Sequence, residues 1–436
     1  MIKPVKFFKG GIKPPHRKNT FNMETVEMPV PEKINIPMLQ HIGKECYPTV
    51  KKGDKVLVGQ KIGDSDSFIS SPVHSSVSGI VTNIKPMLYS GGFDVVSVEI
   101  KTDGEQLPYK VDIPNRTLGN MELLKLIKES GIVGLGGAGF PTFVKLSPVK
   151  NKKLDTLVVN AAECEPYITS DYREMIENPK AIVEGIKIVM ELTQVRKVLI
   201  GIESNKPKAI QILSDLVKSD ENISVVSLKT RYPQGGEKQL IYAVTGRKVS
   251  TGGLPIDVGV LVQNINTLSF LDSYIKTGMP LISKKVTVAG NAISNPMNLK
   301  VLIGTSLQDV FDYCGGFKEN PTKIIMGGPM MGVSQFSLEN TVIKQTNALL
   351  ALTKNEVSID KESVCIRCGK CVDVCPMNLL PLYININVEK GLIEDTSKYN
   401  INDCIECGCC SYICPASRNL VQSIRYAKAE MRKIKK

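Results

Sequence analysis

The sequence predicts a multidomain α/β plus β protein whose last domain is rich in cysteine. Its 436 residues suit about three domains. A content of 42% hydrophobic and 22% charged residues is typical of a globular chain that can bury a core. Short strand-like runs fill residues 1–115, whereas strands alternate with helical patterns over 116–280. Nine of the twelve cysteines lie between Cys365 and Cys414.

The first predicted domain, 1–115, is all-β. The runs VLVGQKIG, GIVTNI and DVVSVEI alternate with turn signals. VKKGDKVLVGQKIGD followed by SPVHSSVSGIV resembles a biotinyl/lipoyl-like barrel-sandwich domain, a family in which a hairpin between the two halves carries a modified lysine. The corresponding residues here, Pro72 to Ser76, include no lysine. We therefore expect a structural or partner-binding module without carrier chemistry.

The second predicted domain, 116–280, is an α/β unit. MELLKLIKES places Leu123, Leu124 and Ile127 on one face of a helix. Strand-like segments at 154–160, 197–202 and 224–228 are separated by helical patterns. Strands that alternate with helices in this way indicate βαβ units and a parallel sheet.

Three shorter regions follow. Residues 281–335 read as a strand pair, a helix and a strand, and they resemble the soluble-ligand-binding β-grasp domain. The polar stretch 336–359 is interpreted as a connector. Residues 360–436 carry the cysteine motifs and end in a basic, helix-like tail.

Two matching cysteine motifs of the form C-x2-C-x2-C-x3-C-P have the spacing of bacterial two-cluster ferredoxins, in which the fourth cysteine of each motif binds the other cluster. This spacing assigns cluster I to Cys365, Cys368, Cys371 and Cys414, and cluster II to Cys404, Cys407, Cys410 and Cys375. The alternative is a pair of structural zinc sites, but zinc ribbons need two CxxC pairs separated by a loop. Cys409 is surplus to the motif and is interpreted as a bystander. The long spacer between the motifs favours a helical ferredoxin domain.

Composition also excludes some functions. The formal net charge is +12, which could attract nucleic acid or an anionic membrane. Tryptophan is absent, aromatics are 6%, and no basic-aromatic stacking motif is found, so nucleic acid is not an expected partner. No run of about 18 apolar residues predicts a membrane span, and the first residues show no secretory signal. We expect a cytoplasmic location.

A glycine-rich stretch, Gly134 to Gly139, satisfies the pattern G-x-G-x-x-G. The usual dinucleotide fingerprint needs a strand before it and a helix after it. Here a helical pattern precedes it and Pro141 follows, so that interpretation fails. What remains is a run of backbone N–H groups with few Cβ atoms, suited to cradling a phosphate or lying flat against a ring.

The wider motifs, VGLGGAGFPTFVK and VVNAAECEPYITSDYREM, resemble the flavoprotein subunit that receives NADH in complex I. The resemblance implies a Rossmann-like domain that binds FMN and NAD(H), and it places contacts to FMN and the nicotinamide at Gly134, Gly136, Gly137, Ala138, Gly139 and Phe140. It puts Lys145 near the flavin phosphate or pyrimidine edge, and it gives cofactor-binding roles to Asn160, Glu163, Glu165 and Tyr167, with Glu165 on the nucleotide. Ala162 stands where that family has an aspartate.

Two later segments continue the resemblance. In RYPQGGEKQLI, Gly236 and Glu237 match the G-E-E segment of that family, and Lys238 replaces the second acid. VQNINTL implies that Gln263, Asn264 and Thr267 lie near the flavin phosphate. Taken singly, each of these residues could instead be a turn glycine or a helix cap.

Across the whole chain, FKGGIKPP, SPVHSSVSG, GGAGFPT, RYPQGGEKQL, GGPMMG and the two cluster motifs, in this order, resemble the RnfC family. RnfC is the peripheral subunit of the Rnf ferredoxin:NAD+ oxidoreductase. The resemblance implies electron transfer between two [4Fe–4S] clusters, FMN and NAD(H) at the cytoplasmic face of the membrane. It implies membrane-embedded and ferredoxin-like Rnf subunits as partners, ferredoxin as an indirect donor, and movement of Na+ or H+ in other subunits.

Two alternatives remain. One is a relative of the same architecture, either a microcompartment cobalamin reductase or an electron donor to proline reductase. The other is a non-catalytic relay scaffold, which the missing acids at Ala162 and Lys238 favour.

Overall fold

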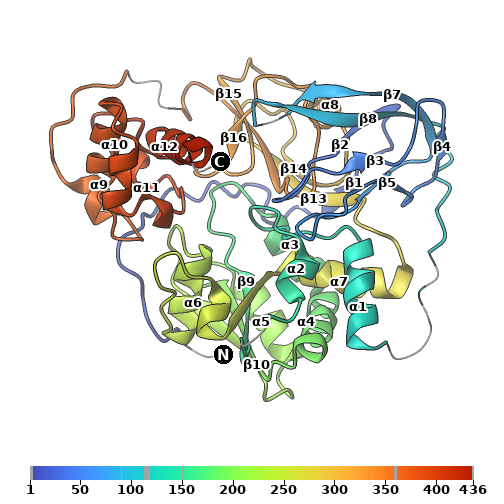
Figure 1. Cartoon of the computed structure of the whole chain (residues 1–436), viewed down its shortest axis with the longest axis horizontal. Coiled ribbons are helices and arrows are strands. Elements are labelled where there is room, and N and C mark those ends of the chain that lie inside the picture. Colours follow the sequence, from blue (N-terminus) through green and yellow to red (C-terminus); the bar gives the residue numbers. More distant parts are fainter. Residues whose placement is uncertain are drawn as a thin grey trace.

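A computed structural model describes residues 3–89, 91–111, 113, 118–149, 152–357 and 361–434. The predicted boundaries at 115/116 and 359/360 lie outside these ranges. Figure 1 shows the β-rich N-terminal module at the upper right, the α/β domain below it, a mixed sheet at the top and the helical C-terminal domain at the upper left.

The N-terminal module is a sandwich of two small antiparallel sheets. One sheet has the order β2 (Lys33–Pro37), β8 (Asp94–Thr102), β7 (Gly79–Leu88) and β4 (Lys55–Val56). The other has the order β3 (Tyr47–Pro48), β5 (Lys61–Asp64) and β6 (Val73–His74). Alternate residues such as Ile34, Ile36, Val98 and Ile100 fill the core between them.

The segment that corresponds to the carrier hairpin is buried rather than projecting. Val73 and His74 form β6, and Ser76 Oγ donates a 2.6 Å hydrogen bond to the carbonyl of Ile303 in the neighbouring domain. Small hydroxyl side chains suit this interior position because each can bond locally to a carbonyl. In this chain, residues 72–76 join modules together.

The α/β domain contains a parallel sheet, as the βαβ pattern predicts. Its order is β11 (Ile223–Leu228), β10 (Lys197–Glu203), β9 (Thr156–Ala161) and β12 (Val260–Asn264). The helices are α1 (Asn120–Glu129), α2 (Thr142–Leu146), α3 (Ser170–Glu177), α4 (Pro179–Thr193), α5 (Pro207–Leu216), α6 (Glu237–Thr245) and α7 (Ile265–Thr277), with a 3-10 turn at Pro255–Val258. The predicted face of Leu123, Leu124 and Ile127 is buried in α1, which confirms that prediction.

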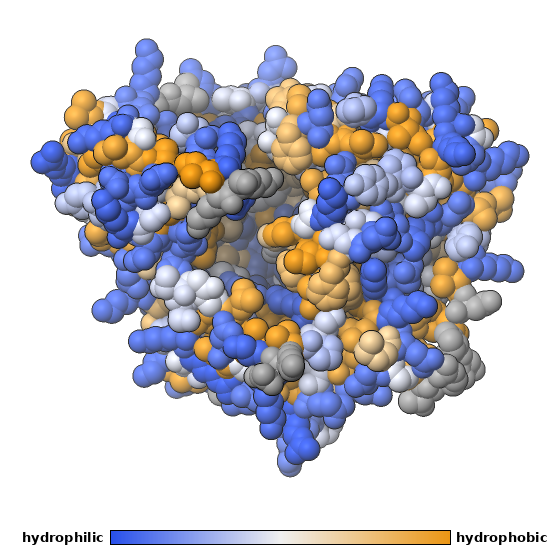
Figure 2. Space-filling view, in the orientation of Figure 1, coloured by the Kyte–Doolittle hydropathy of each residue, from blue (hydrophilic) through white to orange (hydrophobic). Residues whose placement is uncertain are grey.

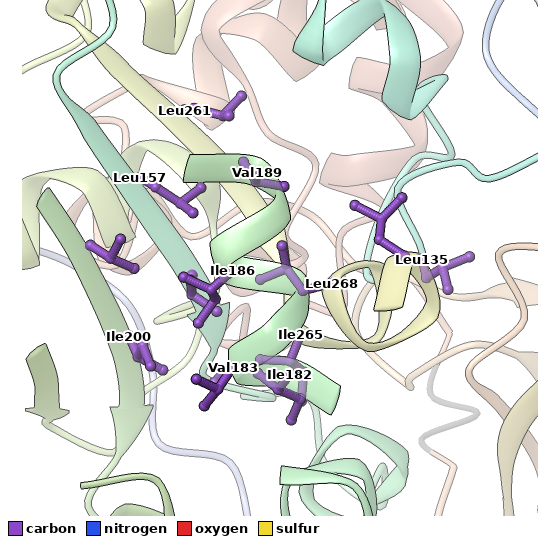
Figure 3. Close-up of a cluster of buried hydrophobic side chains, with 14 of the residues drawn as sticks. Leu135, Leu157, Ile182, Val183, Ile186, Val189, Ile200, Leu261, Ile265 and Leu268 are labelled. Atoms are coloured by element: carbon purple, nitrogen blue, oxygen red, sulfur yellow. The ribbon is translucent and has the colours of Figure 1, made fainter. Parts of the chain in front are cut away.

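Both faces of this sheet are covered. Apolar residues of α1, α4, α5 and α7 cover one face, and α6 covers the other. Figure 3 shows Ile186 and Val189 of α4 near the strand that carries Leu157, and Ile182 of α4 beside Ile265 of α7. This packing fixes the ends of β9 and β12 relative to α7.

The mixed sheet differs from the predicted domain division. Its six strands run in the order β1 (Thr25–Glu27), β14 (Met297–Leu302), β13 (Ser283–Ala289), β17 (Ala348–Leu352), β15 (Lys323–Met326) and β16 (Val333–Ser334), and α8 (Leu307–Tyr313) packs on it. All five residues of β17 are buried. The connector interpretation of 336–359 is therefore wrong for Ala348–Leu352, because this apolar run pairs with β13 and β15. Likewise β1, from the predicted first domain, pairs with β14.

The N-terminal arm, residues 3–24, lies across other domains. Val5 N donates to Ala243 O (2.8 Å) on α6, and Gly11 N donates to Val374 O (2.7 Å) in the C-terminal domain. Ile12 forms an antiparallel bridge with Tyr232. The arm therefore connects the α/β domain to the cysteine-rich domain.

The C-terminal domain is helical, as the long spacer predicts. It contains α9 (Lys370–Asp373), α10 (Pro381–Glu389), 3-10 turns at Glu394–Tyr399 and Ile401–Asp403, α11 (Cys409–Tyr412) and α12 (Leu420–Ile434). Ile384, Ile401, Ile424 and Ala427 form its small core. Within the described ranges, no helix combines the length and apolar character needed to cross a membrane.

Candidate functional site

The glycine-rich stretch forms a closed loop. Val133 bridges Pro141, and Gly134 N donates to Phe140 O at 2.9 Å, so the two ends of the loop are tied together. Gly136, Gly137 and Ala138 are exposed at its tip. A Cβ added at Gly137 would meet no atom within 4 Å. The loop therefore offers a run of backbone that a flat ligand can approach closely.

Two contacts hold the loop over the end of the sheet. Leu135 N donates to the buried hydroxyl of Thr267 at 3.1 Å. A Cβ on Gly136 would collide with the side-chain amide of Asn264. Thr267 and Asn264 are two of the predicted residues, and both lie directly beneath the loop. Gly139, with φ +72°, packs against the side-chain amide of Gln345.

The loop covers the place where the strand order of the sheet reverses. Asn264 is the last residue of β12, and its register partner Asn160 is the penultimate residue of β9. In open α/β sheets, ligands bind at the carboxyl ends of the strands beside such a reversal. Asn160 Nδ2 donates to Gly235 O at 2.8 Å, and Asn264 caps α7 by accepting from Asn266 N at 2.9 Å.

Buried amide groups with an unpaired atom occur in the segments that meet the loop and these strand ends. Among the described residues, Gln234 Nε2, Gln263 Nε2 and Gln345 Oε1 are buried and have no hydrogen-bond partner in the protein. An unpaired buried polar atom is costly unless a ligand or water pairs with it. Of the three, only Gln263 is among the sequence-predicted site residues.

Asp171 is a further charged group beside the loop that the sequence analysis did not single out. It is partly buried and accepts from Asn264 Nδ2 (2.9 Å) and Asn266 Nδ2 (2.6 Å). Burial, with Glu163 nearby, raises the pKa of Asp171 to about 6. Through Asn264, this carboxyl group fixes the amide that contacts Gly136.

The segment 162–168, which carries three predicted residues, is held by two buried lysines. Lys206 Nζ donates to Ala162 O at 2.7 Å, and Lys18 Nζ donates to Glu163 O and Glu165 O, each at 3.1 Å. Glu163 itself turns inward and accepts from the backbone N–H of Asp171 at 2.7 Å, at the start of α3. Sequence reasoning missed both lysines because neither lies in a motif with the segment that it holds.

Glu165 and Tyr167 contact the mixed sheet rather than the glycine loop. The Glu165 carboxylate accepts from the backbone N–H groups of Met330 (3.1 Å) and Met331 (2.9 Å), in the GGPMMG segment. Burial raises the pKa of Glu165 to about 7. Tyr167 donates to Glu356 at 2.8 Å. These contacts bring the GGPMMG motif next to the α/β domain.

Lys145 and Glu237, both predicted site residues, form a partly exposed ion pair at 2.8 Å. Lys145 lies on α2 directly after the glycine loop, and Glu237 is the first residue of α6, which Gly236 precedes as N-cap. A phosphate in this region could compete for the Lys145 ammonium.

The cysteines predicted for cluster II line one small cavity of about 20 Å³. Its lining includes Cys375, Cys404, Cys407 and Cys410, and also Cys409, which is fully buried. The fourth residue of the first motif thus lies among the second motif's cysteines. Among the described residues, no three Cys, His, Asp or Glu side chains lie close enough to hold a single metal ion.

The cysteines predicted for cluster I lie nearer the surface. Cys368 is exposed, whereas Cys365, Cys371 and Cys414 are partly buried. Burial raises the pKa of Cys371, and the electrostatic influence of Cys414 and Cys365 raises it further, so these three thiols are neighbours.

The cluster II cavity adjoins the α/β domain. The hydroxyl of Tyr232, itself buried, donates to Cys407 O at 2.7 Å. Three residues later, Gly235 N donates to Cys164 Sγ at 3.2 Å and Gly235 O accepts from Asn160. A single short segment therefore runs from the cysteine cavity to the end of β9.

Comparison with protein families matches every domain. Residues 6–105 match the RnfC barrel sandwich hybrid domain, 127–272 the Nuo51 FMN-binding domain, 285–334 the SLBB domain and 364–417 a 4Fe-4S dicluster domain. The barrel-sandwich, flavin-binding and two-cluster predictions are confirmed at this level.

Full-length relatives decide the family. The chain is 46% identical to the corresponding subunit of the proton-translocating ferredoxin:NAD(+) oxidoreductase complex of Clostridium ljungdahlii, covering 98% of this chain and 94% of that protein. It is also 46% identical to the corresponding subunit of the Na(+)-translocating complex of Acetobacterium woodii, covering 97% of each. The chain belongs to the RnfC family. An RnfC-family protein of Rhodobacter capsulatus, named as part of an ion-translocating oxidoreductase complex, is 39% identical over 99% of this chain and 85% of its own length.

Three sequence motifs that carry the resemblance to the RnfC family make defined contacts in the structure. FKGGIKPP forms the arm that touches Val374, RYPQGGEKQL links the cysteine cavity to Asn160, and GGPMMG receives the carboxylate of Glu165. These three motifs therefore meet around the cysteine cavity and the adjoining α/β domain.

Proposed function

We propose that this chain is the electron-transfer subunit of an ion-translocating ferredoxin:NAD+ oxidoreductase, and that it passes electrons between two [4Fe–4S] clusters, FMN and NAD(H). The observation that carries the proposal is the Tyr232–Gly235 segment, which runs from the cysteine cavity to Asn160, the register partner of the Asn264 that contacts the glycine loop. Nicotinamide exchanges hydride and iron–sulfur clusters exchange single electrons. A flavin between them can do both.

The site fits FMN. The open backbone at Gly137 can lie against a ring, and the unpaired Gln263 Nε2 can donate to a cofactor acceptor. Asn160, Asn264 and Thr267 place these groups, and Lys145 supplies a cation near the loop. Bound flavin would accept hydride and release electrons one at a time, while the loop orients the ring and excludes water. The strand order, with its reversal beside β9, supports a Rossmann-like description of this domain.

The cavity supports cluster II ligation by Cys404, Cys407, Cys410 and Cys375, and the neighbouring group supports cluster I ligation by Cys365, Cys368, Cys371 and Cys414. Thiolates are the ligands that such clusters require.

Location and partners follow from the family. We place the chain at the cytoplasmic face of the membrane, bound to membrane-embedded and ferredoxin-like subunits, with ferredoxin as an indirect donor. The two relatives that are each 46% identical to this chain belong to complexes named for different ions, H+ in one and Na+ in the other. The choice of ion is therefore assigned to other subunits.

The test is anaerobic purification followed by titration with NADH. We expect FMN on denaturation, about eight irons per chain from two cubanes, and flavin and cluster absorbance that bleach together. Protein that contains its clusters but retains no FMN, and does not oxidise NADH with an artificial acceptor, would be a relay scaffold instead.

A further inference from the structure

Two of the cysteines predicted to bind cluster II are held by segments from outside the C-terminal domain. The hydroxyl of Tyr232, in the α/β domain, donates to Cys407 O at 2.7 Å. Next to Cys375, the backbone N–H of Gly11 in the N-terminal arm donates to Val374 O at 2.7 Å. Because Cys375 and Cys407 belong to different motifs, these contacts reach both parts of the predicted ligand set.

The N-terminal arm also braces Tyr232 itself. Ile12 N donates to Tyr232 O at 2.8 Å and Tyr232 N donates to Ile12 O at 2.9 Å, so the two residues exchange both backbone hydrogen bonds. One residue earlier, Arg231 Nη1 donates to Phe8 O at 3.2 Å, and its guanidinium carbon lies 5.1 Å from the centroid of the Phe8 ring. A Cβ on Gly11, whose φ is +74°, would collide with Tyr232 O. The arm and the Tyr232 segment therefore form one two-stranded unit.

The contact between Tyr232 and Cys407 is buried. Ile12, Tyr232, Cys407 and Cys409 pack together in one hydrophobic cluster. In such apolar surroundings the dipole of a hydrogen bond acts more strongly than it does in water. Figure 2 shows a hollow in the middle of one face, between the places of the C-terminal domain and the α/β domain in Figure 1. The two domains therefore do not pack together across the whole of this face, and buried contacts such as that of Tyr232 hold them together.

We propose that Tyr232, braced by the N-terminal arm, is a positioning residue for electron transfer, and that its hydroxyl determines how readily cluster II accepts an electron from the flavin. This inference rests on the proposed function. The positive end of the O–H dipole points at the carbonyl of a predicted ligand, so it stabilises the negative charge that a cluster gains on reduction. Electrons leave the reduced flavin and enter cluster II one at a time, while the hydroxyl proton stays on Tyr232.

The test is an anaerobic redox equilibrium of protein that contains FMN and both clusters. Tyr232→Phe removes the hydroxyl and keeps the ring. Glu165, whose carboxyl group also bonds to this hydroxyl, keeps its two backbone donors. Cluster II reduction is measured by electron paramagnetic resonance at a series of fixed NADH/NAD+ ratios. Its apparent equilibrium constant should fall about 2- to 10-fold, the range that one net hydrogen bond contributes. The rate at which NADH bleaches the flavin should not change, and the iron content should stay at about eight.

The matched control is Tyr274→Phe, at another buried tyrosine of the same domain, which stacks on Phe270 of its own helix. It should leave the equilibrium constant unchanged. Gly11→Ala tests the brace and should lower the constant. Gly104→Ala should not, because this glycine has a similar φ of +78° but no atom within 4 Å of an added Cβ. The double variant of Tyr232→Phe and Gly11→Ala should lose no more than the larger single loss, since both changes act on one contact.

A Tyr232→Phe variant with the wild-type equilibrium constant overturns the role of the hydroxyl. A variant that retains only about four irons overturns it too, because the hydroxyl would then hold the cluster in place instead of setting its reduction. Losses that add in the double variant overturn the bracing by the arm. Wild-type protein that contains FMN and both clusters, but whose clusters are not reduced by NADH, overturns the proposed function itself.

Discussion

Replacing Gly137 with alanine separates cofactor binding from folding. The added Cβ meets no protein atom within 4 Å, and the φ of Gly137 is not positive, so the empty protein should tolerate it. With FMN bound, the methyl group would lie between the backbone and the ring. Overpacking by such a group costs about 1–3 kcal/mol. At about 1.4 kcal/mol per tenfold, the Kd for FMN should rise roughly 5- to 150-fold.

The assay is a titration of flavin-stripped protein with FMN, in which binding is monitored by the quenching of flavin fluorescence. Gly119→Ala is the control, because the nearest atom to its Cβ is Glu122 Oε2 at 3.8 Å and it lies before α1, outside the loop. Gly136→Ala should instead lower the thermal stability of the stripped protein, since its Cβ collides with Asn264. Wild-type affinity in the Gly137→Ala variant would refute the placement of the ring against this backbone.

Three further outcomes are expected. Cys409→Ala should keep about eight irons, whereas Cys410→Ala should fall to about four; the opposite result, by iron analysis and electron paramagnetic resonance, would make Cys409 the ligand. Burial lowers the pKa of His41 from 6.5 to about 4. The neutral imidazole therefore contributes to stability above pH 6.5, and about 3 kcal/mol of unfolding free energy is lost as the pH falls from 6.5 to 4. His41→Gln does not titrate, so its melting temperature should rise relative to wild type as the pH is lowered through this range. The pKa of Glu165 is raised from 4.5 to about 7, so its pH dependence is the reverse. Its contribution to stability is lost as the pH rises from 4.5 to 7. The melting temperature of Glu165→Gln should therefore rise relative to wild type over that range, and a difference in melting temperature that does not change with pH would contradict the burial argument.

Much of the α/β domain could be predicted because its signals are local. The helical spacing of Leu123, Leu124 and Ile127 can be recognised within one or two turns of sequence. Each strand between helices can be recognised as a short apolar run. The cysteine motifs were equally informative, since three ligands of each cluster lie within seven residues.

The rest depends on contacts between distant parts of the chain. The run Ala348–Leu352 is apolar, but its place between β13 and β15 is set by pairing with strands that lie far from it in the sequence. Backbone carbonyls in the segment 162–168 are bound by two lysine side chains from distant parts of the chain. Lys18 comes from the N-terminal arm and Lys206 from just after the end of β10. Glu165 belongs to a motif that suggests a nucleotide contact, yet its carboxylate is satisfied by Met330 and Met331.

Lys344 shows why the flavin-binding domain depends on the modules around it. Its buried ammonium donates to Pro72 O in the barrel sandwich and to Gly131 O at the base of the glycine loop, each at 2.6 Å. No ion pair found among the described residues includes it, and burial lowers its pKa to about 7. A buried cation without a carboxylate partner is costly, so the surrounding carbonyls must be held rigidly to compensate. Since its neighbour Gln345 packs on Gly139, the residues between β16 and β17 of the mixed sheet hold both ends of the loop. The position of the loop is therefore a property of the whole chain and not of the segment that carries the glycine motif.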